Sequence, residues 1–200
     1  MTSIAVLVSG NGTNLQAIID SVNNGYIPAK IAVVLSDEKR AFALERAKKA
    51  GIDTVVLDKK DFKTREDFDR EVVKQLKKKN VELVVLAGFM RLLSPYFIDE
   101  YRNRIINIHP ALLPAFKGAH GVKDALEAGV KVTGVTVHFV DEHLDGGPII
   151  LQKTVEIKED DNEETLLERV HKEEHRIYPE AIKLFVEGKI KIEGRKVARR

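Results

Sequence analysis

The segment IAVLVSGNGTNLQAII, residues 4–19, decides the fold class. It opens with five consecutive apolar residues, passes through a glycine-containing turn, and continues with the pattern of an amphipathic helix. A strand that is apolar on both faces and leads into a helix is typical of a parallel sheet covered by helices. The turn suits an anion, because glycines let backbone N–H groups approach a ligand and the N-terminus of a helix carries partial positive charge.

The glycine spacing of this turn matches a dinucleotide-binding fingerprint only in part. Gly10 and Gly12 fit the pattern Gly-x-Gly-x-x-Gly, but Leu15 occupies its third position. Asp37 follows the second predicted strand, where such proteins carry a ribose-binding acid. A dinucleotide-binding module is therefore an alternative, and Leu15 argues against it. We expect a phosphate group at this turn.

Apolar runs alternate with helical patterns in the first half of the chain. Strands are predicted at residues 4–8, 31–35, 54–57, 83–87 and 105–108, and helices at residues 14–22, 40–50 and 65–79. The last of these helices begins with a variant of the capping box formed by Thr64 and Asp67. This order predicts an α/β fold, a Rossmann-like open, mostly parallel twisted sheet with helices on both faces.

The pattern changes after residue 108. We expect a long loop with two prolines, a short helix, a strand within residues 131–140, a turn-rich loop, and a strand within residues 149–157. A helix over residues 163–186, interrupted at Pro179, and a small hairpin within residues 189–197 complete the chain. No linker is evident, which predicts a single domain.

Composition excludes several functions. The 200 residues are 44% hydrophobic and carry a formal net charge of +2, without the clustered basic stripe of a nucleic-acid-binding domain. The chain has no cysteine, and its six histidines show no metal-ligand spacing, so we expect no metal. No apolar run approaches the ~20 residues of a membrane span, and no signal peptide is evident. We expect a cytoplasmic protein without nucleic-acid or membrane partners.

Asn107 and His109 are the first candidate catalytic pair. They lie two residues apart at the end of a predicted strand, so their side chains point to the same side. Pro110 favours an extended conformation at His109. An amide and an imidazole together can stabilise an oxyanion and move a proton. The alternative is a structural histidine at a strand end.

Two carboxylates are further candidates. Asp145 lies in the segment LDGG, where it is either a turn residue or a partner of His109, and no spacing rule links the two positions. Glu174 falls on the apolar stripe of the closing helix, so it either has a partner or faces a cavity, or else lies at the helix edge. The stripe consists of Leu166, Val170, Ile177 and Ala181.

Five segments together resemble the glycinamide ribonucleotide formyltransferase family. They are SGNGTNLQAII (residues 9–19), VVLAGFMRLLSP (84–95), IINIHPALLP (105–114), VTVHFVDEHLDGGPIILQ (135–152) and EEHRIYP (173–179). They follow the order of the family and span nearly the whole chain. The resemblance implies transfer of the formyl group of 10-formyltetrahydrofolate to the amine of glycinamide ribonucleotide, through a tetrahedral intermediate, in purine biosynthesis. It also implies a single formyltransferase domain, residues 1–200, with a phosphate-binding half (1–100) and a catalytic and folate-binding half (101–200).

The resemblance also implies residue roles. Asn107 would hold the oxyanion, His109 would shuttle the proton, and Asp145 would orient and charge the histidine. The ribonucleotide would bind through Gly12, Thr13 and Asn14 at its phosphate and through Glu174 at its glycinamide end. The residues implied for the folate donor are Arg65, Met90, Arg91, Leu92, Leu93, Asn107, Val140, Asp141 and Glu142. For Arg65 the alternative is a solvated arginine in the first turn of a helix.

Two related enzymes are alternatives to this family. Formyltetrahydrofolate deformylase uses the same donor but carries a regulatory domain before the catalytic one, for which a first strand at residue 4 leaves no room. Methionyl-tRNA formyltransferase carries a C-terminal barrel for tRNA, whereas we expect this chain to end about where its core closes. The chain departs from the family in a smaller, more basic loop, PAFKGAHG, and in a short C-terminal tail. A homodimer is one assembly that the sequence allows.

Overall fold

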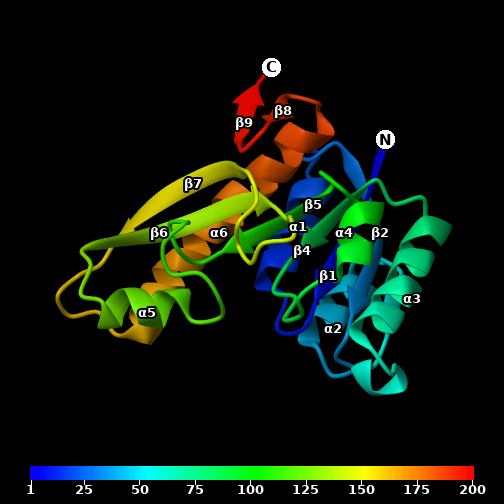
Figure 1. Cartoon of the computed structure of the whole chain (residues 1–200), viewed down its shortest axis with the longest axis horizontal. Coiled ribbons are helices and arrows are strands. Elements are labelled where there is room, and N and C mark those ends of the chain that lie inside the picture. The colour runs from blue at the N-terminus through cyan, green and yellow to red at the C-terminus, as the bar shows by residue number, and fades with distance from the viewer. The chain divides into compact units, whose positions relative to one another are not determined.

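The computed structural model describes residues 1–200, which form two compact units. The first unit comprises Met1–Ile106 and the second Asn107–Arg200. Figure 1 shows strands and helices in each of them. Strand β5 (Ile105–His109) carries the chain from the first unit into the second. That the chain works as one domain, with halves at residues 1–100 and 101–200, stays a prediction.

The first unit contains the parallel sheet. Its strands lie in the order β3-β2-β1-β4, with β5 next to β4. Their bounds are β1 (Thr2–Val8), β2 (Ala29–Ser36), β3 (Thr54–Val56) and β4 (Leu83–Leu86). β1 pairs in parallel with β2 and β4, and β2 pairs in parallel with β3. The predicted α/β class with a mostly parallel sheet is confirmed. Because β1 and β4 are parallel, the loops that follow them leave the same edge of the sheet.

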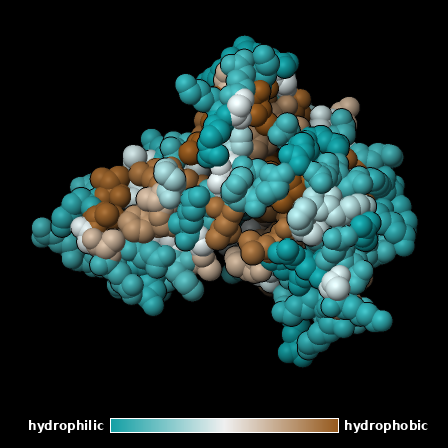
Figure 2. Space-filling model, in the orientation of Figure 1, coloured by the Kyte–Doolittle hydropathy of each residue, from teal (hydrophilic) through white to brown (hydrophobic).

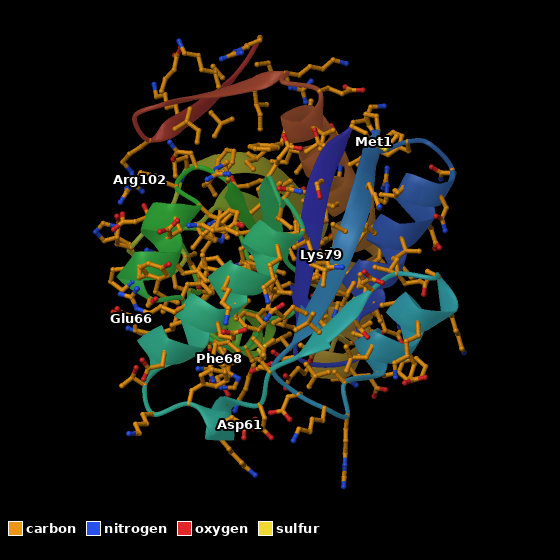
Figure 3. All side chains as sticks on the ribbon, turned by 90° about the vertical axis from the view of Figure 1, so that its right-hand side faces the viewer. Met1, Asp61, Glu66, Phe68, Lys79 and Arg102 are labelled. Atoms are coloured by element: carbon orange, nitrogen blue, oxygen red, sulfur yellow. The ribbon has the colours of Figure 1, made fainter.

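Helices connect these strands. They are α1 (Thr13–Asn23), α2 (Phe42–Lys49), α3 (Arg65–Lys78) and α4 (Pro95–Glu100), with a 3-10 turn η1 (Lys59–Asp61) before α3. The capping box of α3 is present, because Thr64 Oγ1 accepts from the Asp67 N–H at 3.0 Å and the Asp67 carboxylate accepts from the Thr64 N–H at 3.2 Å. Figure 3 marks two residues of α3, the buried Phe68 and the exposed Glu66.

The second unit contains antiparallel pairs. β6 (Val132–Phe139) pairs with β7 (Ile149–Glu156), and β8 (Ile190–Glu193) pairs with β9 (Lys196–Arg199) as the predicted C-terminal hairpin. Two helices, α5 (Gly121–Glu127) and α6 (Glu163–Val186), complete the unit, and α6 packs along β6 and β7 (Figure 1). Part of the core consists of Val122, Val155, Leu166 and Val170.

The predicted interruption of the closing helix at Pro179 is wrong. α6 continues through Pro179 to Val186. A proline removes one helical hydrogen bond and crowds the preceding turn. Tyr178, Ala181 and Ile182 are fully buried around it, so packing holds the helix together on both sides of the proline. The predicted apolar stripe of this helix is buried, and Glu174 is buried with it at 5% exposure.

Figure 2 shows one face of the molecule as largely hydrophilic, with smaller groups of hydrophobic residues. The large hydrophobic side chains exposed to solvent are Met1, Tyr26, Phe42, Val56, Met90, Leu92, Val132 and Leu144. None of the helices combines the length and the apolar character that crossing a membrane requires.

Candidate active site

Ser9 ties together three loops at the carboxyl edge of the first unit's sheet. Its hydroxyl donates to Asp37 Oδ1 at 2.6 Å and accepts from the Met90 N–H at 2.9 Å. Its own N–H donates to the carbonyl of Gly88 at 3.0 Å. Asp37 is buried at 5% exposure, so its carboxylate holds the Ser9 hydroxyl instead of facing solvent as a ribose-binding acid would. Sequence reasoning missed this role of Ser9.

The turn between β1 and α1 has the geometry of an anion-binding turn. Gly12 precedes α1 with φ 76°, a left-handed conformation that favours glycine, and no side chain caps this helix. The amide groups of the first turn, at Thr13 and Asn14, therefore lie where an anion binds at a helix N-terminus. A Cβ at position 12 would lie 2.5 Å from Ala43 Cβ, so packing against α2 is a second reason for the glycine. Leu15, at the third fingerprint position, is fully buried.

The loop after β4 is anchored at its end and exposed at its tip. Met90 is 75% exposed and Leu92 is 58% exposed, whereas Leu93 is buried. The Ser94 N–H donates to Asp69 Oδ2 at 2.6 Å. Burial raises the pKa of Asp69, against the opposing effect of the hydrogen bonds from Ser94. The anchored loop therefore presents two apolar side chains outward.

Arg91 lies in this loop, and Arg65 begins α3. The Arg91 guanidinium stacks over the Phe68 ring, 4.2 Å from its centroid, and Arg91 Nε is buried without a hydrogen-bond partner. Arg65 is the first residue of α3 and is exposed. The structure therefore places Arg65 on the helix that carries Phe68, whose ring Arg91 covers.

His109 is the centre of the polar cluster in the second unit. It ends β5 and is buried at 4% exposure. Its Nε2 lies 2.7 Å from the carbonyl oxygen of Phe116, which can only accept, so Nε2 carries a hydrogen. Its Nδ1 faces Asp145 Oδ2 at 3.6 Å. Acceptors therefore face both nitrogens of the ring.

Asp145 lies in a turn and also faces His109. Its φ of 46° is left-handed, and its side chain is only 10% exposed. Oδ2 accepts from the Gly118 N–H at 2.8 Å, and Oδ1 lies 3.8 Å from His138 Nε2. The carboxylate therefore stands between two histidines and is held by a backbone amide.

His138 orients the amide of Asn107. Its Nδ1 donates to the Phe139 carbonyl at 2.8 Å, so its bare Nε2 accepts from Asn107 Nδ2 at 3.2 Å. Burial lowers the pKa of His138, which keeps the ring neutral and able to accept. The second N–H of Asn107 is left for another acceptor. Sequence reasoning missed His138, although its alternation with Thr136 on a buried strand was the available signal.

Strands β6 and β7 support the loop that follows His109. The Thr136 hydroxyl donates to the Ala111 carbonyl at 2.7 Å and accepts from the Leu113 N–H at 3.0 Å. Gln152 Nε2 donates to the Leu113 carbonyl at 2.9 Å. Two strands therefore fix the segment that brings the Phe116 carbonyl to the histidine.

The remaining predicted residues of the second unit lie on α6 and on the loop after β6. Glu174 Oε2 lies 4.0 Å from His171 Nε2, one turn earlier on α6, and burial lowers the pKa of His171. Val140 and Asp141 are half-buried, and Asp141 Oδ1 accepts from the His143 N–H at 2.8 Å. Glu142 is exposed.

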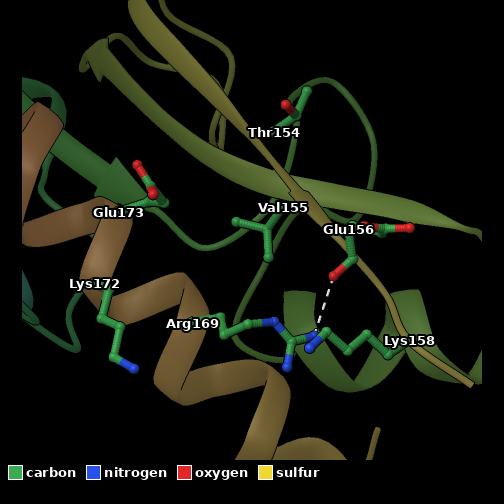
Figure 4. Close-up of a pocket in the computed structure, with 7 residues that line it drawn as sticks. All are labelled: Thr154, Val155, Glu156, Lys158, Arg169, Lys172 and Glu173. Carbon is green, nitrogen blue, oxygen red and sulfur yellow. Dashed lines mark hydrogen bonds between the residues drawn. The ribbon is translucent and has the colours of Figure 1, made fainter. Parts of the chain in front are cut away.

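A separate pocket lies between β7 and α6 (Figure 4). Its lining residues are Thr154, Val155, Glu156, Lys158, Arg169, Lys172 and Glu173. The Arg169 guanidinium donates to the Glu156 carbonyl at 3.1 Å and to Asp161 Oδ1 at 2.8 Å, so protein acceptors occupy it. The pocket contains none of the predicted site residues. No group of three or more His, Cys, Asp or Glu side chains is arranged to hold a metal ion.

The fold is a mostly parallel α/β sheet, and an amide and an imidazole at the end of β5 meet a carboxylate from the loop after β6. This set of groups is typical of enzymes that transfer acyl-type groups. Comparison with known proteins makes this class specific. Residues 2–182 match the formyl transferase family, and the chain belongs to that family. The resemblance seen in the sequence motifs is thereby confirmed.

The chain is similar to relatives that are much longer than itself and to relatives of about its own length. The trifunctional purine biosynthetic protein adenosine-3 of Drosophila melanogaster is 48% identical over 187 residues, which cover 92% of this chain but 14% of that protein. Phosphoribosylglycinamide formyltransferase of Escherichia coli (strain K12) is 46% identical over 190 residues, which cover 95% of this chain and 90% of that protein. Among solved structures, glycinamide ribonucleotide transformylase 1 from Symbiobacterium toebii is 51% identical with a TM-score of 0.98, covering 100% of this chain and 94% of that one.

Proposed function

We propose that this protein transfers the formyl group of 10-formyltetrahydrofolate to the amine of glycinamide ribonucleotide, a step of purine biosynthesis. Family membership and the relatives of matching length support this reaction. The observation that carries the proposal is His109, held between the Phe116 carbonyl and the Asp145 carboxylate, two residues from the oriented amide of Asn107.

The reaction needs one new bond, one broken bond and one proton moved. The amine nitrogen of the ribonucleotide attacks the formyl carbon, and the carbonyl oxygen becomes an oxyanion. The bond from that carbon to N10 of the folate then breaks, and N10 leaves with the proton that the amine has lost. The products are the formylated ribonucleotide and tetrahydrofolate.

Each polar group of the cluster has a role in these reaction steps. Asn107 donates its second N–H to the oxyanion, while His138 fixes the amide orientation. In the reaction, Nε2 of His109 leaves the Phe116 carbonyl to face the substrates, and the ring passes the proton of the attacking amine to the leaving nitrogen. Asp145 faces Nδ1 of His109, stabilises the charged ring and fixes its orientation.

Both substrates bind through the residues that the motifs implied. The phosphate of the ribonucleotide binds the amides at Gly12, Thr13 and Asn14, and Glu174 binds its glycinamide end. The exposed apolar side chains of Met90 and Leu92 suit the flat ring of the donor. The other proposed donor contacts are Arg65, Arg91, Leu93, Asn107, Val140, Asp141 and Glu142.

A transfer assay tests the reaction. The purified protein is mixed with glycinamide ribonucleotide and 10-formyltetrahydrofolate in a buffer that contains a metal chelator. Formation of the formylated ribonucleotide is then followed. We expect turnover that needs both substrates. Formate release at the same rate without the amine would instead identify a deformylase. Binding of NAD with no binding of a folate analogue would favour a dinucleotide-binding module.

A further inference from the structure

Arg46 of α2 contacts the anion-binding turn and the start of α1 through all three nitrogens of its guanidinium. Nε donates to the Asn11 carbonyl at 2.9 Å, and one terminal nitrogen donates to Asn11 Oδ1 at 3.0 Å. The other terminal nitrogen donates to Gln16 Oε1 at 3.3 Å, in the first part of α1. One side chain therefore links the turn to the helix that follows it.

Other contacts between α2 and the turn support the same arrangement. The Ala43 N–H donates to the Gly10 carbonyl at 3.1 Å, and Gly12 packs directly against Ala43. Arg46 is half-buried, and its guanidinium lies 4.9 Å from the centroid of the Phe42 ring. α2 thus forms a surface on which the turn rests, and Arg46 is its polar anchor.

We propose that Arg46 is a positioning residue that pre-forms the turn for the phosphate of the ribonucleotide, an inference that rests on the proposed function. The guanidinium acts through Asn11, because two of its three hydrogen bonds end on oxygens of that residue. A turn that is already ordered binds a phosphate monoester without the entropic cost of ordering it. The ammonium of a lysine is a single point charge and cannot reproduce the planar fork that binds two oxygens of Asn11 and one of Gln16.

The first test compares Arg46→Met with the control Lys48→Met, which removes one charge from an exposed side chain that pairs with Glu45 on the same helix. Without Arg46 the turn has to be ordered when the phosphate binds, so we expect KM for glycinamide ribonucleotide to rise about tenfold or more in Arg46→Met. The donor KM and kcat should change by less than about twofold. In Lys48→Met all three constants should equal those of the wild type.

A double-mutant cycle with Asn11→Ala tests whether Arg46 acts through Asn11. If it does, the combined variant should raise the ribonucleotide KM by much less than the product of the two single effects. Arg46→Lys keeps the charge and is expected to fall between the wild type and Arg46→Met. An unchanged ribonucleotide KM in Arg46→Met would overturn the proposal. A parallel increase in KM for both substrates together with a lower Tm would also overturn it, because that result would indicate general destabilisation.

Direct binding separates this proposal from the proposed reaction. Calorimetry with ribose 5-phosphate as the probe should show weaker binding in Arg46→Met than in the wild type and in Lys48→Met. If the wild type bound the probe but transferred no formyl group, the proposed reaction would fail while the weakened probe binding still supported the role of Arg46. Equal probe binding in all three proteins would reject that role.

Discussion

At the scale of single residues, His109 carries the clearest prediction. Acceptors face both of its nitrogens, and its ring is buried. Replacing it by alanine should lower kcat about 10²–10⁴-fold, the usual contribution of an acid–base group. Both substrates should still bind, as measured by calorimetry with a folate analogue and with the ribonucleotide. A variant with nearly normal turnover would remove His109 from the mechanism.

Asp145 is tested by two substitutions that differ in shape and charge. Asparagine tolerates the left-handed φ of 46° and can still accept from the Gly118 N–H, so Asp145→Asn should fold with an unchanged Tm. It removes the charge beside His109, and kcat should fall about 10²-fold. Asp145→Ala should have both a lower Tm and a lower kcat, because alanine can neither accept from the Gly118 N–H nor carry the charge. If Asp145→Asn kept wild-type kcat, the aspartate would be only a turn residue.

The sequence allowed some site residues to be predicted and hid others. Asn107 and His109 lie on one strand, where a two-residue spacing dictates a shared side. The distance between His109 and Asp145 depends on how two long loops close, which no local pattern encodes. His138 looked like one more residue of a buried strand, because its hydrogen bonds to Asn107 and Phe139 appear only in the folded chain.

At the scale of elements, hydrophobic periodicity was sufficient for long helices and central strands. It failed where an element is short or where packing overrides propensity. α4 spans six residues, too few for a periodic pattern, and its signals were the cap at Ser94 and Pro95 in the first turn. Pro179 was expected to interrupt α6, but buried neighbours on both sides preserve the helix.

The contact between α1 and α2 can be tested with three glycines. Gly10 has open space and an ordinary φ, Gly25 has open space but φ 77°, and Gly12 has both φ 76° and a clash with Ala43. Substitution by alanine should therefore be nearly neutral at Gly10 and should destabilise by about 1–2 kcal/mol at Gly25. Gly12→Ala should add about 1–3 kcal/mol of overpacking to that strain. The measurement is urea unfolding of the three variants.

The order of the three unfolding free energies decides this prediction. Equal losses at Gly12 and Gly25 would mean that α2 moves aside and that the close packing has no energetic weight. In that case the role of α2 as the surface under the anion-binding turn would rest on Arg46 and on the hydrogen bond from the Ala43 N–H to the Gly10 carbonyl.

At the scale of the whole molecule, the division at Ile106 lies close to the change of pattern after residue 108, but the sequence does not fix its position. Strand β5 crosses the boundary without a break, and no linker marks it. The second unit also shows its antiparallel pairs only weakly, because residues on both faces of β6 are buried. The two units are defined by the contacts that form in the folded chain, whereas a hydrophobic pattern indicates only which residues are buried.

Titrating groups in both units give the whole molecule a predictable response to acid. Burial lowers the pKa of His138 below its ordinary value of 6.5. As the pH falls below about 6.5, the unfolded chain binds a proton at His138 that the folded chain does not, so the free energy of unfolding decreases. One such proton contributes a slope of at most about 1.4 kcal/mol per pH unit. The decrease ends at the lowered pKa of the folded state.

Asp161 adds a second, more acidic window. Its hydrogen bond from Arg169 holds its pKa well below the ordinary value of 3.8, so its stabilising effect is present above pH 3.8 and is lost as the pH falls further. Asp69 acts in the opposite direction, because burial raises its pKa and stability is gained as the pH falls toward 3.8. Single-site differences therefore have to be measured against the wild type.

Urea unfolding between pH 3 and pH 8 of the wild type, His138→Gln and Asp161→Asn separates these contributions. Glutamine stays neutral at every pH, so His138→Gln should differ most from the wild type near pH 7, and the two curves should converge below pH 6.5. Asp161→Asn should be less stable by a constant amount above about pH 5 and approach the wild type only below pH 3.8. Parallel curves for His138→Gln and the wild type would show that folding does not lower the pKa of His138, which would contradict this prediction.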